Sequence, residues 1–376
     1  MDIKEFKSGK FIQQTGFKSF FPEYINHEWI ISDPKLTNLL AEASRSIGQL
    51  DMFSEYVPNV DLFIRMHVTK EATQSSKIEG TQTNIEEAIL SEKNIDPEKR
   101  DDWEEVQNYI KALNSAIERL DSLPMSGRLI KETHKLLLTG VRGEHKLPGE
   151  FRKSQNWIGG ASLKDAVFIP PPFTEVPELM SDLEKFLNND QIEVPDLIKI
   201  AIAHYHFETI HPFLDGNGRI GRLLITLYLM DKKLVKKPVL YLSDFFDKHR
   251  TIYYDNLMTV RLKNDLIQWI KFFLTGIIET SEKSISTFNK ILKLKAKADE
   301  HILKLGSTAK KAKILLDELF KKPIVEAYDV SLLLGVSNPT AYSYIKAFIK
   351  LGILVEKTGF QRNQIFVFKK YLDLFK

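Results

Sequence analysis

The sequence HPFLDGNGRIGR, residues 211–222, lies between two amphipathic segments and predicts a loop that opens directly into a helix. Before it, Asp196 follows Pro195, and apolar residues then recur at spacings of three and four as far as Tyr205, which is typical of a capped helix. The same spacing resumes at Ile220. Because neither flank alternates between apolar and polar residues, we expect a helical body around this loop.

The loop combines residue types that suit phosphate chemistry. Gly216 and Gly218 lack a Cβ atom, so backbone N–H groups can approach an anion, and the following helix adds unpaired donors and a positive dipole end. Arg219 and Arg222 lie three residues apart on one helix face and can bind phosphate oxygens as forks. Asp215 offers a hard carboxylate suited to Mg²⁺.

His211 opens the loop and is a candidate general base, because histidine titrates near neutral pH. The segment therefore predicts phosphate chemistry on a nucleotide. Residues 216–221 also match the dinucleotide fingerprint G-x-G-x-x-G, but that fingerprint needs a preceding strand where a helix is expected here. Zinc bound by His204, His206 and His211 is disfavoured by their spacing. A plain glycine-rich turn, with arginines paired to nearby acids, is a further alternative.

The loop resembles the core motif of the Fic family, H-P-F-x-[D/E]-G-N-G-R-x-x-R, at every specified position from His211 to Arg222. The flanking residues 203–210 also look like this family, and the resemblance covers roughly residues 40–280. It implies adenylylation, the transfer of AMP from ATP to a Tyr, Thr or Ser hydroxyl of a target protein or of the enzyme itself.

The resemblance also implies roles for individual residues. His211 would deprotonate the target hydroxyl, and Asp215 would hold the Mg²⁺ that bridges the α- and β-phosphates. Tyr254 follows Tyr253 in a stretch that resembles the family's adenine wall, although core aromatics explain the pair equally well. The predicted nucleotide-binding residues are Gly216, Asn217, Gly218, Arg219, Ile220, Gly221, Arg222, Thr209 and Tyr254.

A second segment, residues 148–172, contains two short β-prone runs, 156–158 and 167–169, separated by Gly159 and Gly160. This pattern predicts a loose β-hairpin. The segment resembles the family's flap, which implies that a target protein docks here by adding a strand beside it.

The string from Ser75 to Gly80 predicts a helix end, with Gly80 just past the last turn and a capping box at residues 83–86 starting the next helix. Glu79 then sits where the helix dipole disfavours an anion, which indicates either a cationic partner or a solvated surface glutamate. The string is similar to the Fic inhibitory motif [S/T]-x-x-x-E-[G/N]. That resemblance implies pairing of Glu79 with Arg222, autoinhibition within one chain and the family's second class. Removal of AMP with help from Glu79 is the alternative activity.

Beyond residue 305 the pattern changes to helix, turn, helix and two strands, which is typical of a winged helix-turn-helix domain. Residues 301–376 carry 13 Lys and Arg against 6 Asp and Glu, which indicates an acidic partner or a lysine-rich surface. The recognition helix at 339–350 has no arginine, so base readout is weak, while Gln361, Arg362 and Asn363 at the wing tip could contact phosphate. A DNA-binding regulator with a nucleotide-sensing Fic domain is therefore a competing function, and protein docking or homodimerisation another role for this domain.

The composition excludes several kinds of functional site and a membrane-spanning segment. The 376 residues are 43% apolar and include no cysteine, which excludes disulfides, thiolate metal sites and a cysteine nucleophile. The most apolar stretch, Leu266–Ile278, is too short and too polar to span a bilayer, and the start has no signal core. We therefore expect a cytoplasmic protein with no membrane partner.

These patterns together predict a mostly α fold: a Fic helical core with a β-hairpin flap, followed by a C-terminal winged helix-turn-helix domain. The expected domains are an N-terminal helical region with the inhibitory helix at 1–100, a Fic catalytic core at 101–280, a helical linker at 281–305 and a winged-helix domain at 306–376.

Overall fold

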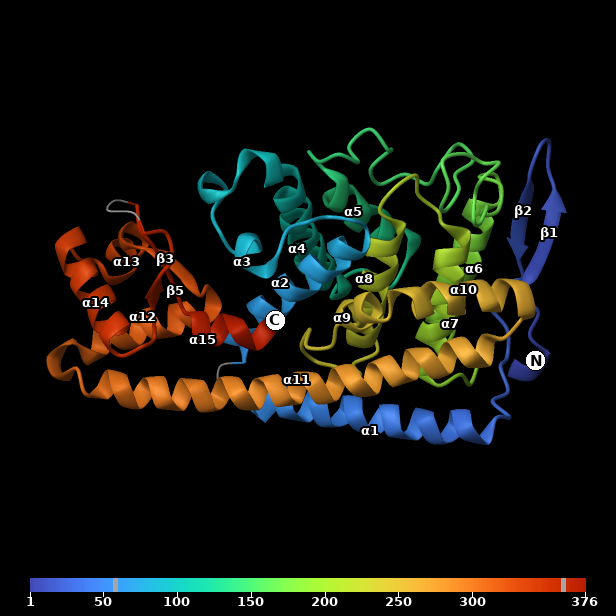
Figure 1. Cartoon of the computed structure of the whole chain (residues 1–376). Coiled ribbons are helices and arrows are strands. Elements are labelled where there is room, and N and C mark those ends of the chain that lie inside the picture. The colour runs from blue at the N-terminus through green and yellow to red at the C-terminus, as the bar shows by residue number, and fades with distance from the viewer. Residues whose placement is uncertain (57–59, 360–362) are drawn as a thin grey trace.

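The computed structural model describes residues 1–56, 60–359 and 363–376, and it confirms a mostly helical fold (Figure 1). The described strands form one two-stranded and one three-stranded antiparallel sheet. The helices are α1 (Pro34–Tyr56), α2 (Asp61–Ile78), α3 (Ile85–Ala88), α4 (Arg100–Leu120), α5 (Gly127–Leu138), α6 (Val176–Asn188), α7 (Asp196–Ile210), α8 (Asn217–Asp231), α9 (Ser243–Lys248), α10 (Arg250–Lys263), α11 (Leu266–Leu303), α12 (Ala309–Lys321), α13 (Ala327–Leu334), α14 (Asn338–Lys350) and α15 (Lys369–Leu372), followed by the 3-10 turn η5 (Asp373–Phe375). The strands are β1 (Gly9–Gln13), β2 (Lys18–Pro22), β3 (Ile324–Glu326), β4 (Val355–Glu356) and β5 (Ile365–Val367).

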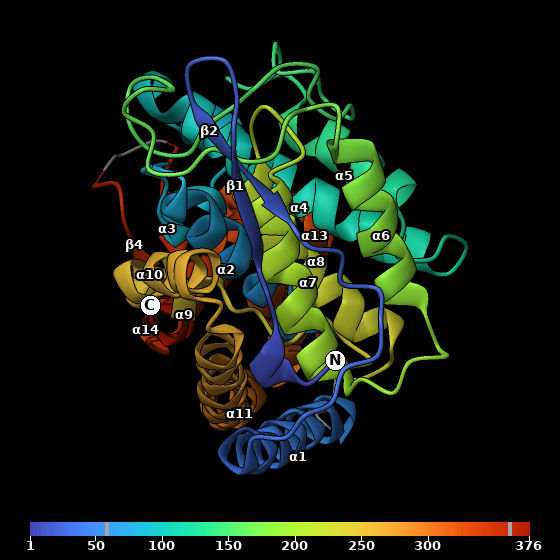
Figure 2. The ribbon, with the colours of Figure 1, turned by 90° about the vertical axis from the view of Figure 1, so that its right-hand side faces the viewer.

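Helices α7 and α8 form the centre of the body, and α7 is buried along its whole length. A helix enclosed on every side needs apolar residues around its full circumference, as α7 has between Leu197 and Ile202. Trp269 of α11 ties this centre to the outer layer by donating a hydrogen bond to the carbonyl oxygen of Ala201 (2.8 Å). Figure 2 shows α7 and α8 enclosed by the other helices.

The long helix α11 runs beneath the body alongside α1 and reaches the C-terminal elements (Figure 1). Its 38 residues correspond to a length of ~57 Å. The predicted linker helix at 281–305 is the second half of this helix rather than a separate element. No proline or glycine interrupts the remainder of α11 after Gly276, and inward-facing residues such as Phe288 and Ile291 continue the buried stripe.

The first part of the chain was expected to be helical, but it contains the hairpin of β1 and β2, paired from Gly9 with Pro22 to Gln13 with Lys18. The hairpin was not predicted because its strands are short and their apolar residues are adjacent, at 11–12 and 20–21, rather than alternating with polar ones. The hairpin adjoins the segment 148–172: the backbone N–H of Phe20 donates to the carbonyl oxygen of Ile169 (2.9 Å).

The predicted β-hairpin at 148–172 is reduced to one antiparallel bridge, between Ile158 and Phe168. Proline at 170–172 removes the backbone donors that a longer ladder needs. The capping box was also predicted one residue too early: the Asn84 side chain accepts hydrogen bonds from the backbone N–H groups of Glu86 and Glu87, and the Glu87 carboxylate accepts one from the backbone N–H of Asn84.

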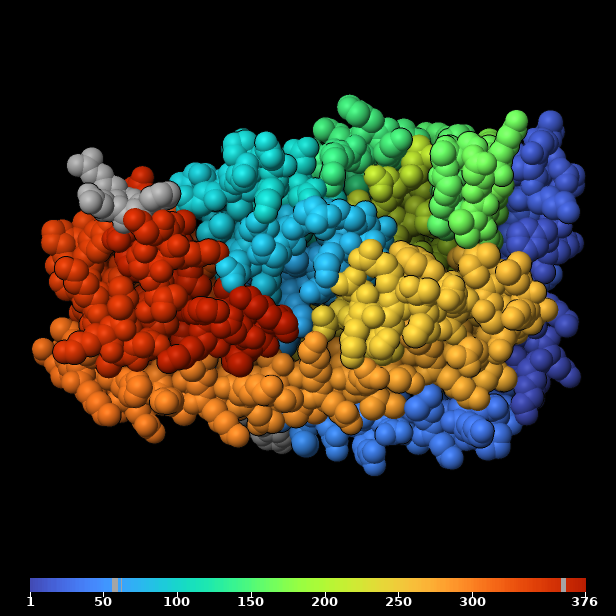
Figure 3. All heavy atoms as spheres, viewed as in Figure 1, coloured from blue at the N-terminus to red at the C-terminus, as the bar shows by residue number. Residues whose placement is uncertain are grey.

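The C-terminal elements run helix α12, strand β3, helices α13 and α14, and strands β4 and β5, with sheet order β3-β5-β4. Gln361 and Arg362 of the predicted wing tip lie outside the described residues, and the winged-helix assignment stays a prediction. This unit lies directly against the segment that follows α2 (Figure 3): Lys357 and Lys376 both bind Glu86, and Lys93 binds Glu326.

An aromatic contact joins α2 to the same C-terminal unit. Phe320 of α12 is fully buried and packs edge-on against Phe63 of α2 (ring centroids 5.6 Å apart) and against Tyr371 (4.8 Å).

Among the helices of the described residues, none is both long enough and apolar enough to cross a membrane.

We expect Phe320→Ala to lower the free energy of unfolding of the C-terminal unit by about 3–5 kcal/mol, because it leaves a cavity between α12, α2 and α15. Leu332→Ala is the control, since this leucine is 64% exposed, and its effect should stay within about 0.5 kcal/mol. Urea unfolding followed by circular dichroism measures both. Equal losses in the two variants would contradict the packing described.

Candidate active site

The loop 211–222 begins at an unusual backbone position. His211 caps α7 in the left-handed conformation (φ 50°, ψ 60°), while its N–H donates to the carbonyl oxygen of Phe207 (2.9 Å). Gly216 is also left-handed (φ 75°) and starts α8. A non-glycine residue in this region is strained, so its surroundings must hold it there. A helix, and not a strand, precedes these glycines, so the loop does not lie in the βαβ unit that a dinucleotide-binding fingerprint requires.

Two side chains from the 148–172 segment hold the His211 corner. Arg152 is 2% exposed, and its Nε donates to the carbonyl oxygen of His211 (3.0 Å) while Nη2 donates to that of Pro171 (2.5 Å). Asn156 Nδ2 donates to the carbonyl oxygens of His211 (3.2 Å) and Phe213 (2.9 Å). A buried cation is favourable here because the C-terminal end of α7 presents unpaired carbonyls and a negative dipole.

The middle of the loop is held by Asn217 and His134. Asn217 Oδ1 accepts from the N–H of Phe213 and its Nδ2 donates to the carbonyl oxygen of Phe213, both at 2.8 Å. His134 stacks on the Phe213 ring (3.7 Å) and joins Gly149 N–H to the carbonyl oxygen of Asp215. Burial lowers the pKa of His134 to about 4, so the ring is neutral. Because both polar atoms of the Asn217 side chain bind the Phe213 backbone, the predicted contact of Asn217 with a nucleotide would be made by its backbone N–H.

The His211 ring is available as a base in its neutral form. Its Nδ1 is buried and has no hydrogen-bond partner among the described residues. Burial, together with the positive charges of Arg261 and Arg152, lowers the pKa of His211 to about 3. A neutral imidazole can accept a proton, but with this pKa it is a weaker base than an ordinary histidine in the arrangement observed.

Arg222 pairs with the end of α2. Its Nη2 donates to Glu79 Oε1 (2.6 Å) and to the carbonyl oxygen of Ser75 (2.9 Å), and its Nε donates to Ser75 Oγ (2.9 Å). The Arg222 side chain is 1% exposed and that of Glu79 is 35% exposed. Burial opposes ionisation of Glu79, but the charges of Arg222 and Arg219 outweigh it and lower the pKa of Glu79.

The Glu79 carboxylate also lies against Gly218 in the first turn of α8, where a Cβ atom would overlap Oε1. It therefore occupies the place at a helix N-terminus where an anion is favoured. Gly80, with φ 105°, lets the chain turn away directly after the glutamate. The structure thus brings the three predicted inhibitory residues, Ser75, Glu79 and Gly80, to the predicted nucleotide loop.

Arg219 lies between two acids. Its Nη1 donates to Glu105 Oε2 (3.1 Å), and its Nη2 is 3.6 Å from Asp215 Oδ1. Arg142 binds the other oxygen of Glu105 (2.8 Å), so the position of Arg219 depends on α4. Glu105, Arg142, His134, Arg152 and Asn156 all contribute to the site, and sequence reasoning missed them because none belongs to a local motif.

Asp215 can serve Mg²⁺ only in combination with other ligands. Its side chain is 43% exposed, and no group of three or more His, Asp or Glu side chains suited to a metal ion occurs in the part of the chain that the structure describes. Mg²⁺ commonly takes one or two protein carboxylates and completes its shell with substrate phosphates and water, so a lone exposed carboxylate fits that mode.

The other predicted residues differ in their access to the site. Thr209 is fully buried and accepts a hydrogen bond from Arg261 Nε (3.1 Å), so any effect on nucleotide is indirect. Ile220 is core, and Gly221 packs against Glu208, whose pKa burial raises to about 7.

The two tyrosines of the predicted adenine wall also differ in how far they are exposed. Tyr253 is buried and hydrogen-bonded to His204 (2.9 Å), whereas Tyr254 is 42% exposed. His204 also bonds the carbonyl oxygen of Gly221 (2.9 Å), so both its ring nitrogens have protein partners and it does not serve a zinc site. Tyr254 alone of the pair keeps a surface that a nucleotide base could contact.

Comparison with protein families matches residues 37–118 to the N-terminal region of the Fic/DOC family and residues 124–229 to the Fic/DOC family itself. The second region includes the whole 211–222 loop. The chain is 33% identical over 141 residues to the protein adenylyltransferase Fic of Aedes aegypti, covering 37% of this chain and 25% of that protein. It is 28% identical to a probable protein adenylyltransferase of Aquifex aeolicus over 211 residues, or 55% of this chain and 58% of that one.

Solved structures agree on the fold. A Fic family protein from Desulfovibrio desulfuricans matches with a TM-score of 0.57 and 23% identity, covering 91% of this chain and 98% of that one. Residues 134–508 of Fic-1 from C. elegans match with a TM-score of 0.51 and 22% identity, over 69% and 75% of the two chains.

The Arg152 contacts generate a prediction about the His211 ring. Arg152→Met removes a positive charge that lowers the pKa of His211, so that pKa should rise, as measured by a histidine NMR titration. It also removes the donors that Arg152 gives to the carbonyl oxygens of Ile210 and His211, so amide exchange near residues 211–213 should accelerate. Lys153→Met, which changes an exposed lysine paired with Glu150, is the control and should alter neither. An unchanged His211 pKa in Arg152→Met would refute this role.

Proposed function

The chain belongs to the Fic/DOC family, and on that basis we propose that it transfers AMP from ATP to Tyr, Thr or Ser hydroxyls of target proteins and of itself. The observation that carries the proposal is the convergence of His211, Asp215, Arg219 and Arg222 around the first turn of α8. The names of the relatives support it, although the matched region spans only about a quarter of the first relative's length.

In the proposed reaction, the target hydroxyl oxygen attacks the α-phosphorus of ATP, the bond to the β-phosphate oxygen breaks and pyrophosphate leaves. His211 takes the hydroxyl proton, and a positioned base of this kind typically contributes roughly 10²–10⁴-fold. Arg219 and Arg222, with the backbone N–H groups at Gly216–Gly218, would stabilise the charge that develops on the phosphates. Asp215 would hold Mg²⁺, which supplies further charge neutralisation when bound.

We further propose that the chain is autoinhibited by Glu79. Its carboxylate occupies the α8 N-terminus and uses an Arg222 donor that phosphate oxygens would need. ATP could then bind without seating its terminal phosphates properly. Because Glu79 is ionised and already faces the nucleotide loop, it could also direct a water toward an AMP-protein bond, which keeps AMP removal as the second candidate activity.

The 148–172 segment is the proposed docking place for the target. Trp157 and Val167 are 40% and 65% exposed there, an unusual surface for large apolar side chains. Arg152 and Asn156 connect this same segment to the His211 backbone, so a docked target would lie next to the base. For the C-terminal unit, binding of DNA, binding of protein and homodimerisation remain proposals, as does a cytoplasmic location.

A labelling experiment tests the transferase proposal. The wild type, Glu79→Gly and His211→Ala are incubated with Mg²⁺ and ATP labelled at either the α- or the γ-phosphate, with and without cell lysate, and protein-bound label is counted. We expect strong α-label only with Glu79→Gly, at least tenfold above the wild type. Glu92→Gly, at an exposed glutamate, is the matched control and should behave like the wild type.

The other outcomes separate the alternatives. Label from the γ-phosphate would mean kinase-like transfer, and label equal in wild type and Glu79→Gly would contradict autoinhibition. No label in any lane, including lysate, would reject AMP transfer and leave the C-terminal unit as the better indication of function.

The lowered pKa of Glu79 makes inhibition insensitive to pH near neutrality. A carboxylate whose folded-state pKa is depressed keeps its ion pair at every pH above that value and loses it only as pH falls through it, here below 4.5. The ratio of Glu79→Gly to wild-type AMP transfer should therefore stay constant between pH 6 and 8. A ratio that falls toward one at pH 6 would contradict this assignment.

A further inference from the structure

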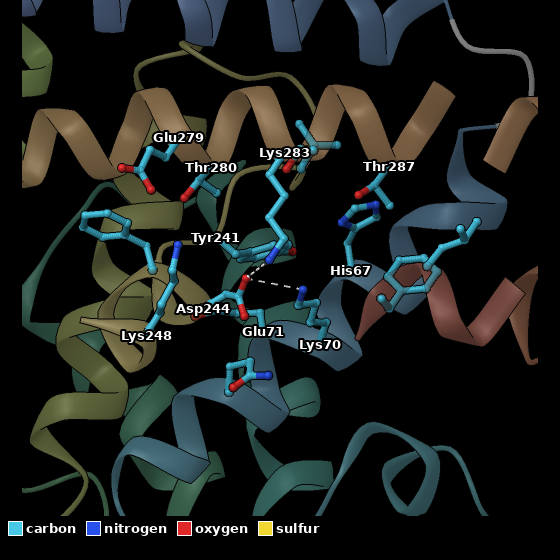
Figure 4. Close-up of a pocket in the computed structure, with 16 residues that line it drawn as sticks. His67, Lys70, Glu71, Tyr241, Asp244, Lys248, Glu279, Thr280, Lys283 and Thr287 are labelled. Carbon is cyan, nitrogen blue, oxygen red and sulfur yellow. Dashed lines mark hydrogen bonds and ion pairs between the residues drawn. The ribbon is translucent and has the colours of Figure 1, made fainter. Parts of the chain in front are cut away.

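A second polar pocket lies between α2, α9, α11 and η5, and none of the residues 211–222 lines it (Figure 4). Its volume is about 90 Å³. Since one water needs ~10–15 Å³ on this measure, the pocket can hold several waters or one tetrahedral oxyanion. Nothing in the Fic motif accounts for it.

Three lysines and the aspartate Asp244 line the floor and walls of this pocket. Lys70 and Lys283 approach Asp244 from opposite walls, with Lys70 Nζ 3.5 Å from Oδ2 and Lys283 in direct contact (Figure 4). Lys248 lines the same pocket, and its side chain forms no ion pair or hydrogen bond with the described residues. Two ammonium groups thus share the Asp244 carboxylate, and the third, that of Lys248, has no acidic partner in the part of the chain that the structure describes.

Two glutamates adjoin the pocket without cancelling this charge at its floor. Glu71 is turned to other partners, because Tyr109 and Ser243 both donate to its carboxyl group, and burial raises its pKa. Glu279 lies on the exposed side of α11, at the rim. An anion that passes Glu279 at the rim therefore faces the lysines and the Asp244 carboxylate, which Lys70 and Lys283 already contact.

Two nearly buried side chains of the wall have polar atoms without partners. His67 Nε2 and the Tyr241 hydroxyl make no hydrogen bond in the described structure, and these residues are only 7% and 8% exposed. An unpaired buried polar group typically costs about 1–3 kcal/mol, so two at one pocket indicate a missing partner. Burial and the charge of Lys70 lower the pKa of His67 to about 3, which leaves a neutral ring able to donate or accept.

The inward face of α11 changes character beside the pocket. Earlier in the helix this face carries buried apolar residues such as Phe273 and Ile277, whereas at the pocket it carries Thr280, Ser284 and Thr287. The packed face of a helix is normally apolar throughout. Hydroxyl groups at successive turns, facing lysines across a small hollow, suit an oxygen-rich anion.

We propose that this pocket binds the phosphate group of a small molecule, held by Lys70, Lys248 and Lys283 with the Tyr241 hydroxyl. Phosphate fits better than carboxylate because its tetrahedral oxygens can meet donors from several walls at once. The pocket includes one face of α2, and Ser75 and Glu79 follow on the same helix. An occupied pocket would therefore stabilise the helix end that contacts Arg222.

Calorimetric titration with inorganic phosphate at pH 7.5 and constant ionic strength tests the proposal on the full chain. We expect saturable binding that Tyr241→Phe weakens about tenfold, the size of a hydrogen bond to a charged group. Lys248→Gln should weaken it to a similar degree. Neither change affects a group that another residue needs, and Tyr241→Phe removes only an unpaired hydroxyl, so both variants should fold.

Matched controls and competing ligands complete the experiment. Tyr205→Phe changes an equally buried tyrosine on α7, and Lys297→Gln changes an exposed lysine on α11, and both should bind phosphate like the wild type. Absence of saturable binding would overturn the proposal, and so would pocket variants that bind like the wild type, because the phosphate would then lie at the 211–222 loop. Tighter binding of ribose 5-phosphate supports a small molecule, whereas tighter binding of a phosphoserine peptide overturns that class. Because binding is the readout, failure here leaves the proposed AMP transfer untouched.

Discussion

The buried guanidinium of Arg222 is the constraint on which the arrangement of this protein depends. A charge with 1% of its side chain exposed is tolerated only with close partners, and here they come from α2, where Glu79 and Ser75 stand 143 and 147 residues earlier in the chain. The pair therefore fixes the end of α2 against the start of α8. The C-terminal unit packs on α2 through Phe320 and on α3 through the Glu86 ion pairs, so its position depends on where α2 and the segment after it lie.

A second constraint acts on the backbone at His211. The left-handed turn there leaves carbonyl oxygens at the end of α7 without helical donors, and Arg152 and Asn156 supply them from the 148–172 segment. The same corner also changes the chemistry of His211, because burial, together with the charges of Arg261 and Arg152, favours the neutral form of its ring. The contacts that stabilise this corner thus also help to keep the His211 ring neutral.

Sequence reasoning succeeded where short-range chemistry decides the outcome. Helices α7 and α8, the loop between them and the end of α2 at Gly80 follow from apolar spacing, glycine and capping preferences. It was off by one residue at the cap of α3, because Thr83 and Asn84 both start a plausible box and only Asn84 takes the geometry. Asn217 was assigned to nucleotide by resemblance, yet its side chain is used by the Phe213 backbone.

Residue types within a few positions of one another indicated the helical class and predicted a phosphate-binding loop at residues 211–222, whereas the pairing of Glu79 with Arg222 was predicted from resemblance to the family's inhibitory motif. The packing of the helices is what places Glu105 and Arg142 beside Arg219, Arg152 beside His211, and lysines from three helices in the pocket next to Tyr241. Those contacts join residues tens to hundreds of positions apart. No local periodicity encodes such neighbours, because they arise only when the helices pack and buried charges must find partners.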